Sequence, residues 1–528
     1  MSDSTDSYPD FRPFRWESPA QSKRADAVAE EILQRLGFRQ GPFERAEPYR
    51  MNLKPPRIAP STLAEFRNAL SPENVDAGPR ARSAHADGYS TLDLLRHRLG
   101  DGSHAPDAVL YPASHEQVVD LLAVASELQV AVVPFGGGTS VVGGLTPSAQ
   151  EFRGCVALDL GRLDQLLGVD AVARTVTAQA GMPGARLEAE LARAGYTLGH
   201  FPQSFERGTI GGYAATRSAG QASTGYGRFD ELVTALTVAT PSGTVETGTA
   251  PRSAAGPDLR QLFLGSEGTL GIITGMTARI RPAPEQSWLE GWSFDTFEVG
   301  AETLRALAQD GPTPTIVRLS DENETLAAFP GLPARQGQCV AVVGFEGSAD
   351  DVEQRRKRAQ KTLASSGTSL GTEIGEQWNR SRYQGPGLRD ALLDRGLFVE
   401  TLETAAFWPG VIPLHRAVRA AIQEALREDG TPSFVTCHIS HIYETGASLY
   451  FTVLCEAGAD PFSRWEAAYR AAGSEIISAK ATCTHHHGVG SDHRALYHRE
   501  IGPVALEALR AVKRSLDPQG ILNPGILV

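Results

Sequence analysis

The sequence predicts a protein of the α/β or α+β class with two or three domains. Its 528 residues are too many for a single hydrophobic core. Short apolar strands alternate with amphipathic helices between residues 114 and 194, which is the pattern of helices packed on a sheet. The prolines of Pro282-Ala283-Pro284 then break regular structure and indicate a domain boundary.

Individual elements follow from local patterns. Ser114 and Gln117 form a capping-box pattern ahead of apolar residues at helical spacing from Val118 to Leu128. Thr and apolar residues alternate in one of the predicted strands, as they do in a half-buried sheet. We further expect a helix near Ala25–Leu36 in a polar lead-in, strands at Val130–Val133, Val156–Leu160 and Arg174–Ala180, and helices at Gly184–Ala194 and Pro503–Leu516.

Composition excludes several classes of protein. A net charge of −12 argues against a protein that binds the phosphates of nucleic acids. The five cysteines are scattered and never form CxxC, which argues against a disulfide framework or a zinc site and fits a reducing cytoplasm. We expect no secretory signal, no membrane span and no C-terminal sorting tripeptide.

The strongest local signal is the glycine-rich turn Pro134-Phe135-Gly136-Gly137-Gly138-Thr139-Ser140, directly after a buried strand. Glycines let backbone N–H groups approach an anion without interference from Cβ, and Thr139 and Ser140 add hydroxyl donors. A pyrophosphate is the anion that we expect such a loop to bind. The spacing is not GxGxxG, so a nicotinamide-type Rossmann fingerprint is not indicated. From these residues alone, a plain structural glycine loop is an equal alternative.

Two further segments join glycines to hydroxyl side chains and short apolar strands, at residues 209–220 and 265–273. In this order and spacing, the three segments resemble the flavin-binding half of the vanillyl-alcohol-oxidase family. The resemblance implies FAD, with its pyrophosphate on the first loop, its ribityl chain and ring along the second, and its adenine side along the third. The implied FAD-binding residues are Pro134, Gly136, Gly137, Gly138, Thr139, Ser140, Gln203, Ser204, Phe205, Thr209, Gly211, Gly212, Thr216, Arg217, Ser218, Arg252, Glu267, Gly268, Thr269, Leu270, Gly271, Ile272 and Ile273.

The same resemblance implies an α+β fold, with a two-lobed FAD-binding domain and a substrate (cap) domain of mixed sheet and helices. We expect a lead-in over residues 1–100, the FAD-binding domain over 101–285, the cap domain over 286–480, and a C-terminal segment over 481–528 that returns to the flavin. Many members attach flavin through a histidine in or near the first loop. Gly138 and Thr139 stand there instead, so we expect non-covalent FAD.

The second half of the chain resembles one branch of that family, the alkyldihydroxyacetonephosphate synthases. The resemblance runs from about Asp87 to near the C-terminus. Its motifs are Leu388-Arg389-Asp390-Ala-Leu-Leu-Asp394-Arg395-Gly396, Glu403-Thr404-Ala-Ala-Phe-Trp408, Gly446-Ala-Ser-Leu-Tyr450-Phe451 and His485-His486-His487-Gly488-Val489-Gly490. It implies exchange of the acyl group of acyl-dihydroxyacetone phosphate for a fatty alcohol. This forms an ether-lipid precursor without net redox change.

The resemblance also assigns roles to residues. Tyr450 matches the family's acid/base tyrosine, and His485, His486 and His487 match its required histidines. Arg389 matches the arginine that binds the substrate phosphate, and a planar fork of donors suits phosphate. An ordinary tyrosine pKa is near 10, so we expect a neighbour such as His486 to stabilise the phenolate. Taken singly, each of these residues could equally be a structural tyrosine, histidine or arginine with no catalytic role. Only their joint order favours catalysis.

The main alternative is an FAD-dependent 2-hydroxy-acid dehydrogenase of the D-lactate type that passes electrons to an external acceptor. The C-terminal Ile521-Leu522-Asn523-Pro524-Gly525 resembles those enzymes, and the residues after the histidine motif depart from the synthases. The metal-binding dehydrogenases carry a second histidine where this chain has Tyr450, so we expect no metal. A flavin module without catalysis is a third possibility.

The expected partners follow from this interpretation. They are a phosphorylated lipid substrate and a fatty alcohol, without nucleic acid. We expect a homodimer in the cytoplasm, and lipid substrates are compatible with peripheral contact to a membrane.

Overall fold

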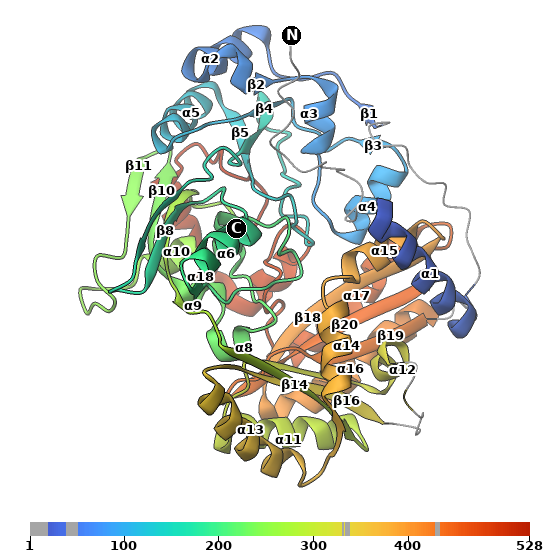
Figure 1. The fold of residues 1–528 in the computed structure, drawn as a ribbon. Helices are drawn as coiled ribbons and strands as arrows, with labels where there is room; N and C mark the ends of the chain where they lie inside the picture. The colour runs from blue at the N-terminus through green and yellow to red at the C-terminus, as the bar shows by residue number, and fades with distance from the viewer. Residues whose placement is uncertain (1–18, 39–50, 330–331, 333–337, 428–432) are drawn as a thin grey trace.

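The computed structural model describes residues 19–38, 51–329, 332, 338–427 and 433–528. These residues form two lobes (Figure 1). One lobe carries the first half of the chain together with the C-terminal segment, and the other carries a seven-stranded sheet with its helices. The expected α+β architecture is therefore confirmed.

The first lobe contains two sheets. The smaller sheet has the order β2-β4-β6-β5, and its strands β4, β6 and β5 run parallel. Helices α2 (Pro60–Leu70) and α5 (His115–Leu128) bury Phe66, Leu121 and Leu122 against it. Ser114 caps α5 by accepting a hydrogen bond from the backbone N–H of Gln117. The strands are β2 (Val75–Asp76), β4 (Ala108–Leu110), β5 (Val130–Phe135) and β6 (Gly154–Asp159).

The larger sheet of this lobe is antiparallel, with the order β11-β10-β12-β8-β7. Helices α6 (Gly184–Arg193) and α7 (Ile210–Thr216) bury Leu187, Leu191 and Ile210 in its core. Its strands are β7 (Leu166–Asp170), β8 (Thr175–Gln179), β10 (Val233–Thr240), β11 (Gly243–Glu246) and β12 (Ile272–Arg279).

The second lobe is built on a sheet with the order β17-β14-β16-β15-β19-β20-β18. Alternate side chains of its strands, such as Cys437, Phe451 and Val453, pack on helices α11 (Phe297–Asp310), α13 (Ala349–Leu363), α16 (Trp408–Arg427) and α17 (Pro461–Ser478). Period-two alternation turns the intervening residues to the opposite face. The strands are β14 (Gln286–Phe294), β15 (Ile316–Ser320), β16 (Cys339–Gly347), β17 (Thr368–Gly371), β18 (Leu397–Phe407), β19 (Ser433–Ile439) and β20 (Gly446–Glu456).

The two ends of the described chain cross between the lobes. Helix α1 (Pro19–Leu36) packs its Ala29 and Leu33 on α15 (Gly385–Leu393), as Figure 1 shows, and Asp26 pairs with Arg395. The C-terminal residues return to the first lobe, where the carbonyl of Ile521 accepts from the N–H of Val132.

One expectation about the ends of the chain needs correction. Besides α1, the lead-in contributes three further α-helices, namely α2, α3 (Pro79–Ala84) and α4 (Thr91–Arg98), and α2 packs in the core of the first lobe. The helix expected at Pro503–Leu516 is confirmed, since α18 (Arg494–Leu516) consists of two helical segments that meet at a kink at Gly502, where φ is 75°. Among the described residues, no helix is both long and apolar enough to cross a membrane.

Candidate active site

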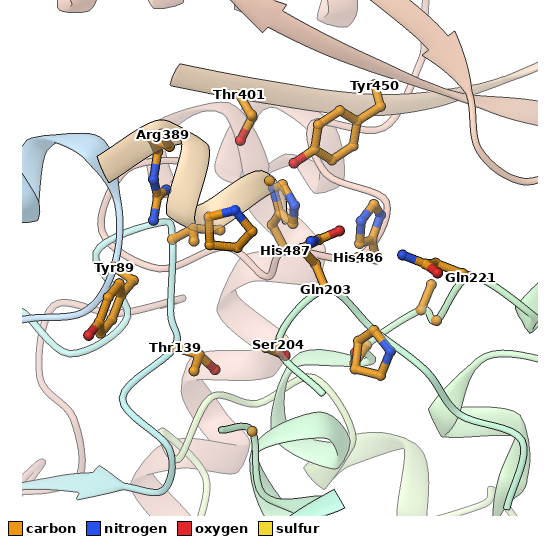
Figure 2. A pocket seen from close by; sticks show the side chains of 18 of the residues that line it. Tyr89, Thr139, Gln203, Ser204, Gln221, Arg389, Thr401, Tyr450, His486 and His487 are labelled. Atoms are coloured by element: carbon orange, nitrogen blue, oxygen red, sulfur yellow. The ribbon is translucent and has the colours of Figure 1, made fainter. Parts of the chain in front are cut away.

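A cavity of about 950 Å³ lies between the two lobes and is lined by both. Arg389, Thr401 and Tyr450 enter it from the cap side, and Thr139 and Ser204 face them from the first lobe (Figure 2). His486 and His487 lie between the two groups. Segments far apart in the sequence therefore meet around one cavity.

The glycine-rich loop after β5 forms one wall of the cavity, and its shape fits a pyrophosphate. Within the described part of the chain, the backbone N–H groups from Gly136 to Ser140 donate to no other residue. Unpaired donors in a row make an anion-binding concavity. At Gly137 a Cβ would lie 2.0 Å from the carbonyl oxygen of Arg207, so only glycine allows this close packing.

The second and third flavin segments also line the cavity, but some of their predicted residues do not. Cavity-lining residues include Gln203, Ser204, Thr209, Gly211, Gly212, Thr216, Ser218, Glu267, Gly268, Gly271, Ile272 and Ile273. Phe205 instead packs on Phe201, and Leu270 and Thr269 are buried in the protein. Arg217 donates to the carbonyl of Leu264, and Arg252 lies on an exposed stretch away from the cavity.

Tyr450 lies on the cavity face of β20, and its neighbours follow from strand register. It is paired with Glu403 on β18 and with His438 on β19, so these three side chains share one face. The His438 ring stacks on Tyr450 with 4.9 Å between centroids. Burial raises the pKa of Tyr450 to about 12, against the opposing effect of a hydrogen bond with Thr401.

The expected stabilisation of a Tyr450 phenolate by His486 is therefore not found. The two rings stack with 6.0 Å between centroids, which is a packing contact. The raised pKa makes Tyr450 a neutral hydroxyl at neutral pH, so that it can donate a proton or a hydrogen bond before it can accept one.

Arg389 reaches the cavity from α15. Among the described residues it forms no ion pair, and its Nε is buried without a hydrogen-bond partner. Glu400 is near enough for the positive charge of Arg389 to lower its pKa, yet burial prevails and raises that pKa to about 7. An unpaired guanidinium in a partly buried cavity is suited to an anionic ligand.

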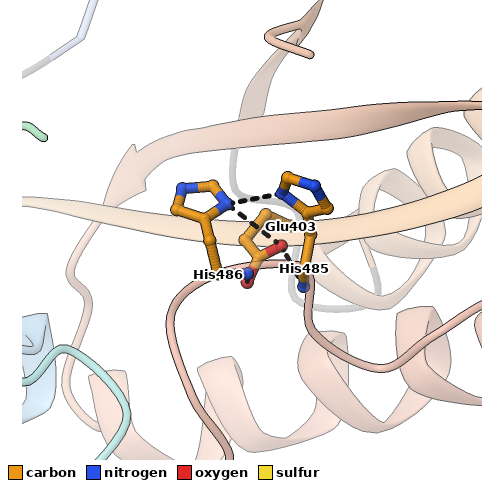
Figure 3. Close-up of side chains that lie close together, drawn as sticks. All are labelled: Glu403, His485 and His486. Atoms are coloured by element: carbon orange, nitrogen blue, oxygen red, sulfur yellow. Dashed lines mark hydrogen bonds and ion pairs between the residues drawn. The ribbon is translucent and has the colours of Figure 1, made fainter. Parts of the chain in front are cut away.

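The three consecutive histidines have different surroundings. His486 and His487 line the cavity, whereas His485 is buried behind them. Glu403 accepts hydrogen bonds from the backbone N–H groups of His485, His486 and His487 at 2.5, 3.1 and 3.0 Å, and from the hydroxyl of Thr484 at 2.6 Å. Figure 3 shows Glu403 beside His485 and His486. This carboxylate holds the turn that points two imidazoles into the cavity.

A second buried carboxylate holds the end of the same motif. Glu267 of the first lobe accepts from the backbone N–H groups of Val489 at 2.8 Å and Gly490 at 2.9 Å. Burial raises the pKa of Glu267 to about 7. Glu267 therefore joins the third flavin segment to the histidine motif, and it also lines the cavity.

Glu403, His485 and His486 lie close enough together to hold a metal ion. The oxygens of Glu403 already accept four hydrogen bonds, and His485 Nδ1 is 2.9 Å from His486 Nδ1. A cation would have to displace these contacts. The cluster is therefore better described as a hydrogen-bonded network.

Several cavity residues were not predicted. Arg318 pairs with Glu324, and both contact His438, at 3.0 Å from Arg318 Nη1 to Nε2 and 2.9 Å from Glu324 to Nδ1. Tyr89 accepts from Arg207 at 2.6 Å and also lines the cavity. Alternation of Thr436 and His438 along β19, continued by Ser440 just after the strand, was the available signal, because polar residues at every second position mark a face turned to a polar space.

The fold and the cavity define a class, the two-domain FAD-linked flavoproteins. Residues 106–249 match the model of an FAD binding domain, and residues 283–527 match the C-terminal domain of FAD linked oxidases. The unpaired donors of the glycine loop fit this cofactor. FAD is accordingly the cofactor of the protein.

Within this class, the chain is similar over nearly its whole length to one group of enzymes. Alkyldihydroxyacetonephosphate synthase of Trypanosoma brucei brucei is 32% identical over 502 residues, covering 90% of this chain and 82% of the relative. The synthase of Dictyostelium discoideum is 30% identical with the same coverage. A solved alkyldihydroxyacetonephosphate synthase superposes with a TM-score of 0.80 at 28% identity, covering 94% of this chain and 92% of that one. The chain belongs to the alkyldihydroxyacetonephosphate synthase family.

Proposed function

We propose that this protein exchanges the acyl group of an acyl-dihydroxyacetone phosphate for a fatty alcohol, and so forms an ether bond with no net redox change. The observation that carries the proposal is the meeting of Arg389, Tyr450, His486 and His487 in one cavity with the FAD-binding loops. Each residue type has a separate task in that chemistry.

Arg389 would hold the phosphate of the substrate. Its guanidinium has no ion-pair partner among the described residues, so it can give both arms of its fork to phosphate oxygens. Binding at this point would orient the rest of the substrate across the cavity toward Tyr450, on the neighbouring strand face.

Tyr450 and the two cavity histidines would handle protons at the reacting carbon. Bound FAD supplies the electron-accepting ring of the site. Tyr450 is a neutral hydroxyl because burial raises its pKa to about 12, so it enters the reaction as an acid. Burial lowers the pKa of His486 and of His487, so these imidazoles are neutral, and each can give a proton at one nitrogen and take one at the other.

The test is a direct comparison of substrates with the purified FAD-loaded protein. Acyl-dihydroxyacetone phosphate and a long-chain alcohol should give an ether product, measured by mass spectrometry, without an electron acceptor. D-Lactate with a dye acceptor should give no dye reduction. Dye reduction by D-lactate, together with no ether product, would favour the dehydrogenase alternative.

The state of assembly and the location belong to the same proposal. A homodimer is tested by light scattering of the purified protein. Peripheral contact with lipid is tested by sedimentation with phospholipid vesicles, and the cytoplasmic location by fractionation of cells. A monomer that does not sediment with the vesicles would contradict both the homodimer and the peripheral contact with lipid.

A further inference from the structure

A chain of three side chains leads from the cavity toward the surface. His486 lines the cavity, His485 is buried behind it, and Tyr443 lies half-buried beyond His485. The Tyr443 hydroxyl oxygen is 2.6 Å from His485 Nε2, and His485 Nδ1 is 2.9 Å from His486 Nδ1. Among the described residues, Nε2 of His486 has no hydrogen-bond partner, so it is free to meet a ligand in the cavity.

Both imidazoles of this chain are neutral. Burial lowers the pKa of His485 and of His486 well below the usual value. A neutral imidazole has one donor nitrogen and one acceptor nitrogen, so the chain has two consistent proton arrangements. In the first, His486 carries its proton on Nε2 and accepts at Nδ1 from His485, which accepts from Tyr443. In the second, every hydrogen bond runs the other way, and His486 Nε2 is an acceptor.

The outer end of the chain approaches solvent. Tyr443 precedes the exposed residues Glu444 and Thr445. Arg228 donates from Nη1 to the carbonyl oxygen of His485 at 2.8 Å, and its charge favours the Tyr443 phenolate although burial raises that pKa overall. Asp230 and Glu231 lie on the same side and act in the opposite sense. Tyr443 is only half-buried, so the relay proposed below would exchange protons with water at this end.

The proposed reaction needs a group that both gives and takes a proton. One carbon–oxygen bond breaks and the acyl group departs as a carboxylate, which takes up a proton and leaves as the acid. A carbon–oxygen bond to the alcohol forms, and the alcohol hydroxyl loses its proton. The two protons cancel and no electrons are gained or lost. His486 can give its Nε2 proton without becoming an anion only if a proton reaches Nδ1 at the same time.

We propose that Tyr443, His485 and His486 form a proton relay between the cavity and the surface. This inference rests on the proposed function. As the carboxylate departs, His486 Nε2 gives it a proton, His485 passes a proton to His486, Tyr443 passes one to His485, and water supplies Tyr443. The alcohol then gives its proton to His486 Nε2, and the shifts run in reverse. The relay is reset in each turnover, and no charged imidazole is required.

The test replaces Tyr443 with phenylalanine, which removes the outer hydroxyl alone. Tyr443→Phe should lower kcat on the order of 10²-fold, the lower end of the usual contribution of positioned proton transfer, with FAD content and the KM for the phosphorylated substrate unchanged. Added imidazole, a small proton carrier, should restore part of the rate. A merely structural defect would not respond to it. Tyr469→Phe is the matched control, because the Tyr469 hydroxyl has no partner among the described residues.

Unchanged kcat in Tyr443→Phe, or a loss that imidazole does not restore, would overturn the relay. Absence of ether product with the wild type would instead refute the proposed function. In that case the relay is tested without turnover, by ¹⁵N NMR of labelled histidines in the FAD-loaded protein. The His485→Gln variant identifies which signals belong to His485. We expect neutral rings whose tautomer signals change in Tyr443→Phe and not in Tyr469→Phe. A protonated ring at pH 7, or no change, would contradict it.

Discussion

Replacement of Arg389 by lysine tests how the cavity holds a phosphorylated substrate. Arg389 offers a fork of donors with no competing ion pair among the described residues, whereas lysine keeps the charge but offers a single point. Truncating a buried charge contact costs about 2–5 kcal/mol, and we expect about 2–3 kcal/mol here because the charge remains. At about 1.36 kcal/mol per tenfold, kcat/KM should fall about 30- to 150-fold.

The assay is the initial rate of ether formation with acyl-dihydroxyacetone phosphate varied at saturating alcohol. The KM for the alcohol and the FAD content should not change, because Arg389 lies outside the three flavin segments. Arg470→Lys is the matched control, since this exposed arginine lies outside the cavity lining and pairs with Glu466 on the same helix, α17. A kcat/KM within threefold of the wild type would show that another group holds the phosphate.

Three further predictions follow from the same geometry. Tyr450→Phe should lower turnover by roughly 10²–10⁴ with FAD still bound, and near-normal ether formation would remove Tyr450 from the chemistry. Acid or heat precipitation should release yellow flavin into the supernatant, and colour retained in the pellet would indicate a covalent bond. The pKa of Glu267 is raised to about 7, so its contribution to stability is fully present below about pH 4.5 and is lost as the pH rises through 7. Calorimetry should therefore find Tm falling more steeply from pH 6 to 8 in the wild type than in Glu267→Gln, and parallel curves would refute this.

The sequence predicted the elements that have strong local signals. The Ser114 cap, the strand before the glycine loop and the loop itself are confirmed, because each is encoded by neighbouring residues. The three additional helices of the lead-in, α2, α3 and α4, and its two short strands were missed, since short elements such as β2 are stabilised by pairing with a distant strand, here β4. The helix from Pro503 was predicted because proline favours the first turn of a helix, whereas the helical segment before Gly502 was missed.

Site residues that belong to a recognisable sequence motif could be predicted. Residues that reach the site only because distant segments pack together could not. Tyr450, Arg389 and two of the histidines were placed on the cavity by resemblance. The role of Glu403 depends on the register of β18 against β20 and on a turn about 80 residues later, as its bond to the N–H of His485 shows. Likewise Glu267 contacts Val489, which lies more than 200 residues later in the chain. Contacts of this kind are set by tertiary packing and leave no local pattern.

In the proposed reaction, an acyl group is exchanged for an alkoxy group at one carbon of a phosphorylated substrate. The most direct measurement uses alcohol labelled with ¹⁸O and follows both products by mass spectrometry in the absence of any electron acceptor. One fatty acid should be released for each ether formed, with the label in the ether and none in the acid. Label in the released acid, or reduction of the flavin by D-lactate with no ether formed, would contradict it.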